Sequence, residues 1–279
     1  MALIQKIVKK RKQKGYTIIE VMIVLTISTA LFATAIIGYT RQNQRTQFTN
    51  AVRDIELIVQ DILNDVGTGY YVQSDEFVCL RSGSPAAPSL LSPPPPGVLS
   101  EQGTNQGCIF LGKAVNLRDT DSSSSFTAHT IVGLRNHANN EEDPSTNVEN
   151  AANRTIPFEG TYDRYSISGS LDIPKIITSD ETEVAGFAVV SGFGNGSLAD
   201  GGAGGAGATT NQVSIASIDR LYDFNSTTSQ VVGSSDLNKD ITICIREAGE
   251  GRRASITIGA GAQANVQTTI DSWPDGCET

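Results

Sequence analysis

The stretch KKRKQKGYTIIEVMIVLTISTALFATAIIG, residues 9–38, constrains this chain more than any other. Positions 1–15 hold six basic residues and no acidic residue, and no charged residue lies between Val21 and Gly38. A helix needs about 20 mostly apolar residues to span a bilayer. Residues 16–40 therefore predict a transmembrane helix, and the basic residues before it predict a cytoplasmic N-terminus.

Glu20 stands inside this apolar segment, five residues after Gly15. A charge at membrane depth is costly and is by default a functional feature. A secretory signal peptide fits poorly, because the apolar segment is too long and no A-x-A-like cleavage site follows it. A plain signal anchor would fit the length but would leave both Gly15 and Glu20 unexplained.

The residues KGYTIIEVMIVL, 14–25, resemble the class III signal of type IV prepilins and type II secretion pseudopilins. That family has a basic leader ending in glycine, an aromatic first mature residue, usually phenylalanine, and glutamate at mature position five. These positions fall here on Gly15, Tyr16 and Glu20, with tyrosine in place of phenylalanine as a mild departure. The resemblance implies a leader of residues 1–15, cleavage between Gly15 and Tyr16 by prepilin peptidase, and methylation of Tyr16.

The resemblance also implies a role in assembly for Glu20. The new amine at Tyr16 is positively charged, and a buried charge without a partner is strongly destabilising. Glu20 would be its counterion, in the same subunit or in a neighbour. The implied partners are other pilin subunits, prepilin peptidase, an inner-membrane assembly platform, and membrane lipid before assembly. The implied location is a single pass of the cytoplasmic (inner) membrane, followed by an extracellular or periplasmic filament.

Residues 41–67 predict an amphipathic continuation of the helix. Apolar residues recur with the period of one buried helical stripe. Gly67 and Gly69 are expected to end a helix that spans residues 17–66. The stripe consists of Phe48, Ala51, Val52, Ile55, Ile58, Val59, Ile62, Leu63 and Val66.

Residues 68–279 predict a β-rich extracytoplasmic head, because short runs of β-forming residues alternate with turn residues. The fold class is therefore α+β, with a long N-terminal helix packed on a mainly antiparallel β head. A proline-rich insert, 82–97, predicts polyproline conformation. The polar insert 136–154 and the glycine-rich insert 192–211 predict surface loops. The expected strands are 108–117, 126–134, 162–167, 184–191, 212–218, 241–246 and 254–258.

The four cysteines are widely spaced and form no CxxC pair, and the two histidines, His129 and His137, lie far from them in sequence. Two disulfides in an oxidising compartment are therefore favoured over a zinc site. Four cysteines allow three connectivities. We favour Cys79–Cys108 and Cys244–Cys277, because each pair brackets a loop-like stretch; closing such loops stabilises by about 3–4 kcal/mol each.

The charge of the chain argues against general affinity for nucleic acid. The net charge is −9; without the six basic residues of positions 1–15, 15 basic residues face 30 acidic ones, a balance of −15. Residues 241–259 nevertheless resemble the closing hairpin of GspH/FimT-type minor pilins, and in some relatives a similar segment binds DNA during uptake. Arg246, Arg252 and Arg253 are the candidate phosphate contacts, although structural or solvated ion pairs are favoured for them.

The sequence contains no convincing catalytic constellation, so neither enzyme activity nor a cofactor is predicted. Asp236, Asn238 and Asp240 resemble the start of a calcium loop, but the glycine and distal glutamate of an EF-hand are missing, and an Asx-turn is favoured. The favoured function is that of a structural subunit, a minor pilin or pseudopilin of a type IV pilus-like filament. The alternatives are a DNA-capturing or adhesive tip pilin and a membrane-anchored extracytoplasmic enzyme.

Overall fold

The computed structural model describes residues 15–70, 78–82, 87–93, 108–117, 125–134, 153–167, 171–191, 213–220, 224, 230–233, 236–237, 239–249, 251–259 and 265–278. The chain divides into two compact units, residues 1–47 and residues 48–279. Helix α1 (Ile18–Thr68) contributes residues 18–47 to the first unit and 48–68 to the second.

Local sequence sets both ends of α1. At the N-terminus, the Glu20 N–H donates a hydrogen bond to Thr17 Oγ1 at 3.3 Å, so Thr17 caps the helix. At the C-terminus, the Gly69 N–H donates to the Val66 carbonyl at 3.2 Å and the Tyr70 N–H to the Asp65 carbonyl at 2.7 Å. With Gly69 at φ +74°, these bonds form a Schellman motif. The helix therefore ends two residues later than position 66, at the second of the two expected glycines.

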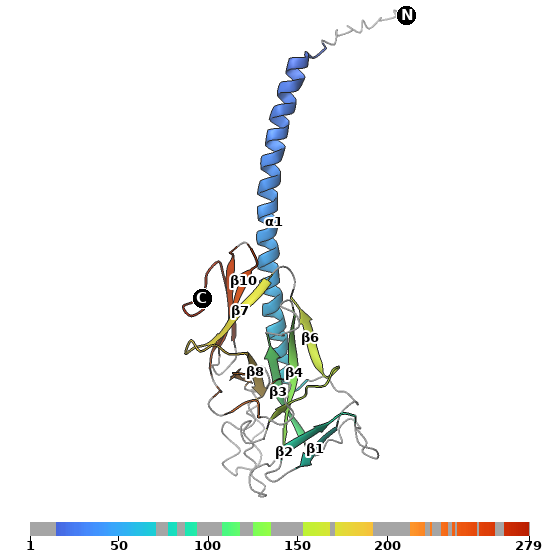
Figure 1. Ribbon diagram of the computed structural model, residues 1–279, viewed down its shortest axis with the longest axis vertical. Coiled ribbons are helices and arrows are strands. Elements are labelled where there is room, and N and C mark those ends of the chain that lie inside the picture. The colour runs from blue at the N-terminus through green and yellow to red at the C-terminus, as the bar shows by residue number, and fades with distance from the viewer. Residues whose placement is uncertain are drawn as a thin grey trace, which may run out of the picture. The chain divides into compact units, whose positions relative to one another are not determined.

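The described residues of the second unit form three antiparallel sheets (Figure 1). The six-stranded sheet has the order β5-β4-β3-β8-β9, with β6 also paired to β4; the four-stranded sheet has the order β12-β11-β10-β7; and β1 pairs with β2. The strands are β1 (Val78–Ser82), β2 (Ala87–Leu91), β3 (Cys108–Asn116), β4 (Ser125–Leu134), β5 (Arg154–Thr155), β6 (Tyr162–Ser166), β7 (Leu171–Thr178), β8 (Gly186–Ser191), β9 (Val213–Ile218), β10 (Ile241–Glu247), β11 (Arg253–Gly259) and β12 (Asn265–Ile270).

The main core lies between α1 and the two larger sheets. Figure 1 shows β3, β4, β7, β8 and β10 along the C-terminal part of the helix. Phe126 and Phe187 of the six-stranded sheet and Ile243 and Ile256 of the four-stranded sheet belong to one buried apolar cluster with the helix. Alternate side chains along these strands belong to this cluster, because successive side chains of a strand point to opposite faces of the sheet. The buried helix residues are Phe48, Ala51, Val52, Ile55, Val59, Ile62 and Val66, which confirms the predicted stripe.

The opposite face of the six-stranded sheet is covered by segments without regular structure. Buried Asn153 holds one of them: its Oδ1 accepts hydrogen bonds from the N–H groups of Val231 and Val232, at 2.9 and 2.8 Å, and its Nδ2 donates to the Val232 carbonyl at 2.8 Å. Thr155 Oγ1 donates to the Phe224 carbonyl at 3.0 Å. The sheet is therefore buried on both faces.

The structure confirms the α+β class and all seven expected strands, and it adds β1, β2, β5, β7 and β12. The polyproline prediction for 82–97 is wrong at β2, which pairs with β1 and contains Pro88. Among the described residues this strand has a partner on only one side, so a proline without an N–H is tolerated. The loop prediction for 136–154 is wrong at its end, where Asn153 is buried and Arg154 lies in β5; the rest of that insert and all of 192–211 lie outside the described residues.

Candidate functional site

The segment around the predicted cleavage site lies on the surface of the first unit. Gly15, Tyr16 and Thr17 precede α1 and are exposed, and Glu20 lies in the first helical turn, also exposed. Thr17 and Glu20 have the T-x-x-E spacing of a capping box. The Gly15–Tyr16 bond thus lies on exposed, non-helical backbone next to the start of the helix. Residues 1–14 of the predicted leader lie outside the described residues.

The part of α1 in the first unit presents apolar side chains on all sides. Large apolar residues from Ile18 to Tyr39 are exposed in this chain. The most apolar 18-residue window of the helix has a mean hydropathy of 2.3, and none of it is buried. By length and composition this helix can cross a membrane. An apolar surface of this kind needs lipid or protein to cover it.

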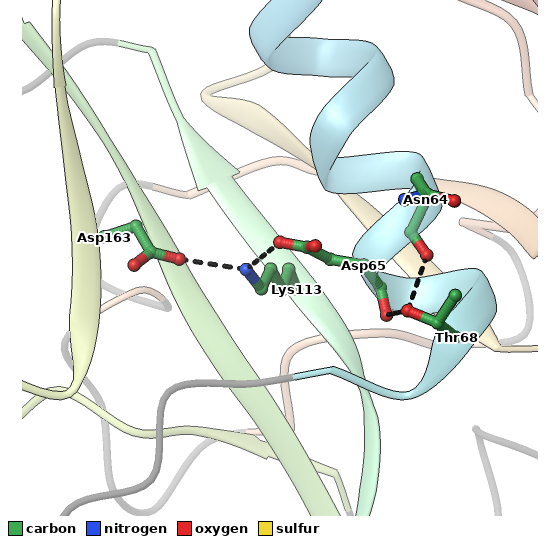
Figure 2. Close-up of polar contacts among 5 residues, drawn as sticks. All are labelled: Asn64, Asp65, Thr68, Lys113 and Asp163. Carbon is green, nitrogen blue, oxygen red and sulfur yellow. Dashed lines mark hydrogen bonds and ion pairs between the residues drawn. The ribbon is translucent and has the colours of Figure 1, made fainter.

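Sequence reasoning missed a buried charge in the second unit. Lys113 of β3 is 1% exposed, and its Nζ donates hydrogen bonds to Asp65 Oδ2 at 2.8 Å and to Asp163 Oδ2 at 2.9 Å. Figure 2 shows the ammonium group between Asp65, which comes from the last turns of α1, and Asp163, which comes from β6. We call these three residues the Lys113 cluster. It joins the end of the helix to two neighbouring parts of the six-stranded sheet.

The charges of the Lys113 cluster favour its ionised form. Burial alone would lower the pKa of Lys113, but the hydrogen bonds to Asp65 and Asp163 outweigh it, and the pKa lies above the usual 10.5. The pKa of neighbouring Tyr165 is also raised, first by burial and then by the negative charge of Asp163. One signal was available in the sequence. Lys113 and Val115 are two positions apart in a strand, so their side chains point to the same face of the sheet, and Val115 is part of the core around the helix.

Arg252, a candidate DNA contact, is oriented toward α1. Its Nε lies 2.6 Å from Glu247 Oε2, and its guanidinium lies over the ring of Phe48, 6.0 Å from the ring centroid. Its side chain is 17% exposed. The contact with Glu247 is an ion pair by distance, although that oxygen has no hydrogen bond of acceptable geometry. Arg252 therefore helps to close the β10–β11 turn over the helix.

The other two candidate arginines are also paired with acids. Arg253 lies over the ring of Trp273, 4.7 Å from its centroid, with Glu278 at 3.6 Å from its Nη1. Arg246 donates a hydrogen bond to Asp172. The structure places Arg246 and Arg253 opposite each other on the β10–β11 hairpin, next to Arg252, and supplies each of the three arginines with a carboxylate.

The proposed calcium residues take part in turns. Asp236 Oδ2 accepts a hydrogen bond from the Gly233 N–H at 2.9 Å, and the Asp240 carbonyl accepts one from the Ser179 N–H at 2.9 Å. Asn238 lies outside the described residues. Within the described ranges, no group of three or more His, Cys, Asp or Glu residues has the arrangement of a metal site. Of the two histidines, His129 is buried in β4 beside Tyr162, and His137 is not described.

The structure contains the two disulfides that the sequence analysis favoured, Cys79–Cys108 and Cys244–Cys277. The first ties β1 to the start of β3. The second ties β10 to the C-terminal segment, where Lys175 Nζ also donates a hydrogen bond to the Gly276 carbonyl at 2.8 Å. The first therefore joins the β1–β2 sheet to the six-stranded sheet, and the second holds the C-terminal segment against the four-stranded sheet.

Comparison with known proteins supports the N-terminal assignment. Residues 10–36 match the family model of the prokaryotic N-terminal methylation motif. No curated protein and no solved structure matches the chain. The matched residues include Gly15, Tyr16, Glu20 and most of the apolar segment. The chain therefore carries a type IV pilin-type prepilin signal, which implies processing by prepilin peptidase, membrane anchoring and assembly with other pilins.

Proposed function

We propose that this protein is a minor pilin or pseudopilin, a structural subunit of a type IV pilus-like filament. Prepilin peptidase would cleave it between Gly15 and Tyr16, and it would assemble through its N-terminal helix. In this proposal, residues 1–15 are the leader, 16–40 the membrane and filament-core helix, 41–67 the amphipathic helix, and 68–279 the extracytoplasmic head.

The observation that carries the proposal is that the methylation motif leads directly into a helix with two different surfaces. The apolar surface of residues 18–39 is exposed in the isolated chain, whereas the stripe that begins at Phe48 is buried in the head. The first part is thus available to lipid before assembly and to other subunits afterwards. The second part holds the head on the same helix.

Glu20 has a defined task in this proposal. The amine freed at Tyr16 is a cation in an apolar environment, and Glu20 lies within the first turn beside it. Pairing of this acid with the amine of a neighbouring subunit would remove two unpaired charges from the filament core and set the register between subunits.

The test compares Glu20→Gln with Asp54→Asn, which neutralises an exposed acid farther along α1. We expect both variants to be cleaved and inserted in the membrane. Filaments would be collected by shearing from the cell surface or by isolation from the periplasm. We expect these filaments to lack Glu20→Gln and to contain Asp54→Asn at the wild-type level. Incorporation of Glu20→Gln at the wild-type level would contradict the assigned role of Glu20.

The DNA-capturing alternative gains no support from the hairpin, because each of the three arginines is paired with a carboxylate. The acidic charge balance of the chain after the leader also argues against DNA binding.

A further inference from the structure

Thr17 fixes the residue at which α1 begins. Its Oγ1 accepts a hydrogen bond from the Glu20 N–H at 3.3 Å, and its carbonyl accepts one from the Val21 N–H at 3.2 Å, which is the first bond of the helix. These two bonds define the N-cap, whose side chain satisfies an N–H of the first turn while its own backbone is not helical. The helix therefore starts at Ile18 and not earlier.

The predicted cleavage site lies immediately before this boundary. Gly15 and Tyr16 are exposed and non-helical, and the Gly15 carbonyl is outside the hydrogen-bond ladder of the helix, because that ladder begins at the Thr17 carbonyl. Hydrolysis adds water across the Gly15–Tyr16 amide and leaves a Gly15 carboxylate and a Tyr16 amine. Negative charge develops on the Gly15 carbonyl oxygen in the transition state, and a peptidase stabilises it with its own hydrogen-bond donors. A carbonyl outside the helix is available to those donors.

Gly15 is the alternative N-cap. Glycine and threonine are about equally good at this position, whereas alanine, valine and isoleucine are poor. Among residues 15–20, GYTIIE, only Gly15 and Thr17 belong to the favoured kinds. With Gly15 as the N-cap, the helix would begin at Tyr16, and the Gly15 carbonyl would accept the i→i+4 bond from the Ile19 N–H. The amide to be cleaved would then be part of the helix, with its carbonyl oxygen already occupied.

Two spacings in the sequence favour a boundary at Thr17 over one at Gly15. Glu20 follows Thr17 by three residues, which is the spacing of a capping box. Tyr16 and Val21 occupy the positions of a hydrophobic staple, directly before the cap and four residues after it. A cap at Gly15 would have neither, because an isoleucine lies three residues after it and a lysine directly before it. The choice between the two caps therefore depends on Thr17 and its neighbours.

We propose that Thr17 is a positioning residue for processing: by capping α1 it keeps the Gly15–Tyr16 amide outside the helix, in the form that prepilin peptidase cleaves. This inference rests on the proposed function, since it takes that amide as the substrate, and all three residues lie within the matched motif, residues 10–36. Chains capped at Gly15 do not bind productively, so the apparent affinity falls with the fraction of chains capped at Thr17. Loss of the Thr17 cap therefore raises KM and leaves kcat unchanged.

The test measures cleavage of the purified full-length chain by prepilin peptidase in detergent. Thr17→Val keeps nearly the shape of threonine but has no capping oxygen, whereas Thr17→Asn changes the shape and keeps an oxygen that caps at least as well. Thr26→Val is the matched control, because the Thr26 hydroxyl donates to the Ile23 carbonyl at 2.9 Å within the helix and caps nothing. We expect kcat/KM to fall by about fivefold in Thr17→Val, through KM, and to stay at the wild-type value in the other two.

Backbone chemical shifts of the uncleaved chains, measured by NMR, supply a second readout at the boundary itself. The shifts of Gly15 and Tyr16 should be non-helical in the wild type and Thr17→Asn, and should move toward helical values in Thr17→Val. Cleavage of Thr17→Val with the wild-type kcat/KM would overturn the inference, and so would non-helical shifts in that variant.

Equal slowing of Thr17→Val and Thr17→Asn would also overturn it, because the peptidase would then recognise the threonine directly. Each of these outcomes leaves the proposed function intact, since the wild type is still cleaved between Gly15 and Tyr16. A wild-type chain that the peptidase does not cleave would instead refute the proposed function, and this inference with it.

Discussion

Replacing both Asp65 and Asp163 with asparagine would leave the Lys113 ammonium group buried between two neutral amides. Lys113 is 1% exposed, so water cannot take over the lost pairing. Removing the partner of a buried charge costs about 3–5 kcal/mol of folding stability. Each single Asp→Asn variant keeps one carboxylate beside the ammonium and should lose about 1 kcal/mol. The double variant should therefore be less stable than the sum of the two single variants predicts.

Lys113→Met is the matched comparison, because it removes the buried charge instead of its partners. The side chains of Asp65 and Asp163 are 27% and 29% exposed, so both carboxylates can be hydrated after the lysine is gone. A buried ion pair replaced by apolar atoms is often close to neutral in stability. We expect Lys113→Met to lose about 1–2 kcal/mol, because two like charges remain near each other. The triple variant D65N/K113M/D163N should therefore be more stable than D65N/D163N, because it no longer contains the buried, unpaired ammonium group.

Urea unfolding of the full chain in detergent would measure these differences. Far-UV circular dichroism reports the whole fold, and the fluorescence of Trp273, the chain's one tryptophan, reports the second unit. The reasoning is refuted if D65N/D163N proves as stable as Lys113→Met.

Alkaline pH provides a second test of the Lys113 cluster. The folded pKa of Lys113 is raised above its ordinary value of 10.5, so its contribution is fully present below pH 10.5 and is lost as the pH rises through the folded pKa. The stability gap between the wild type and Lys113→Met, which has no titrating group at this position, should therefore stay constant from about pH 7 to 10 and narrow above that range. A gap that narrows below pH 9 would contradict the assignment.

Three further changes test the packing of the second unit. Gly112→Ala should lose about 1–3 kcal/mol in urea unfolding, because the added Cβ would lie 2.0 Å from the Val189 carbonyl oxygen. Replacing Cys244 and Cys277 together with serine should lose about 3–4 kcal/mol in urea unfolding, since the disulfide closes a loop with a sequence separation of 33. Arg252→Ala should lose about 1 kcal/mol and lower the thermal midpoint, because the largely buried carboxylate of Glu247 loses its ion-pair partner.

Sequence reasoning succeeded where one local pattern determines the structure. The 3.6-residue stripe predicted the buried face of α1, and Gly67 and Gly69 predicted its end to within two residues; the helix closes at Gly69, because glycine readily adopts the left-handed conformation that closes a helix. Strands β2 and β7 were missed because Pro88 and Pro174 interrupt their β-forming runs. An edge position tolerates each proline, but edge positions are set by tertiary pairing. The Lys113 cluster was missed for a related reason, since its residues are 48 and 50 positions apart in sequence from the lysine.

The central claim is that this chain enters the pilin pathway through the signal at Gly15 and Tyr16. The most direct measurement is the intact mass and N-terminal sequence of the protein from cells with and without prepilin peptidase. The account predicts loss of residues 1–15, with a methyl group on Tyr16, only where the peptidase is present. An identical, unprocessed chain in both strains would contradict it and leave a plain membrane anchor with Glu20 unexplained.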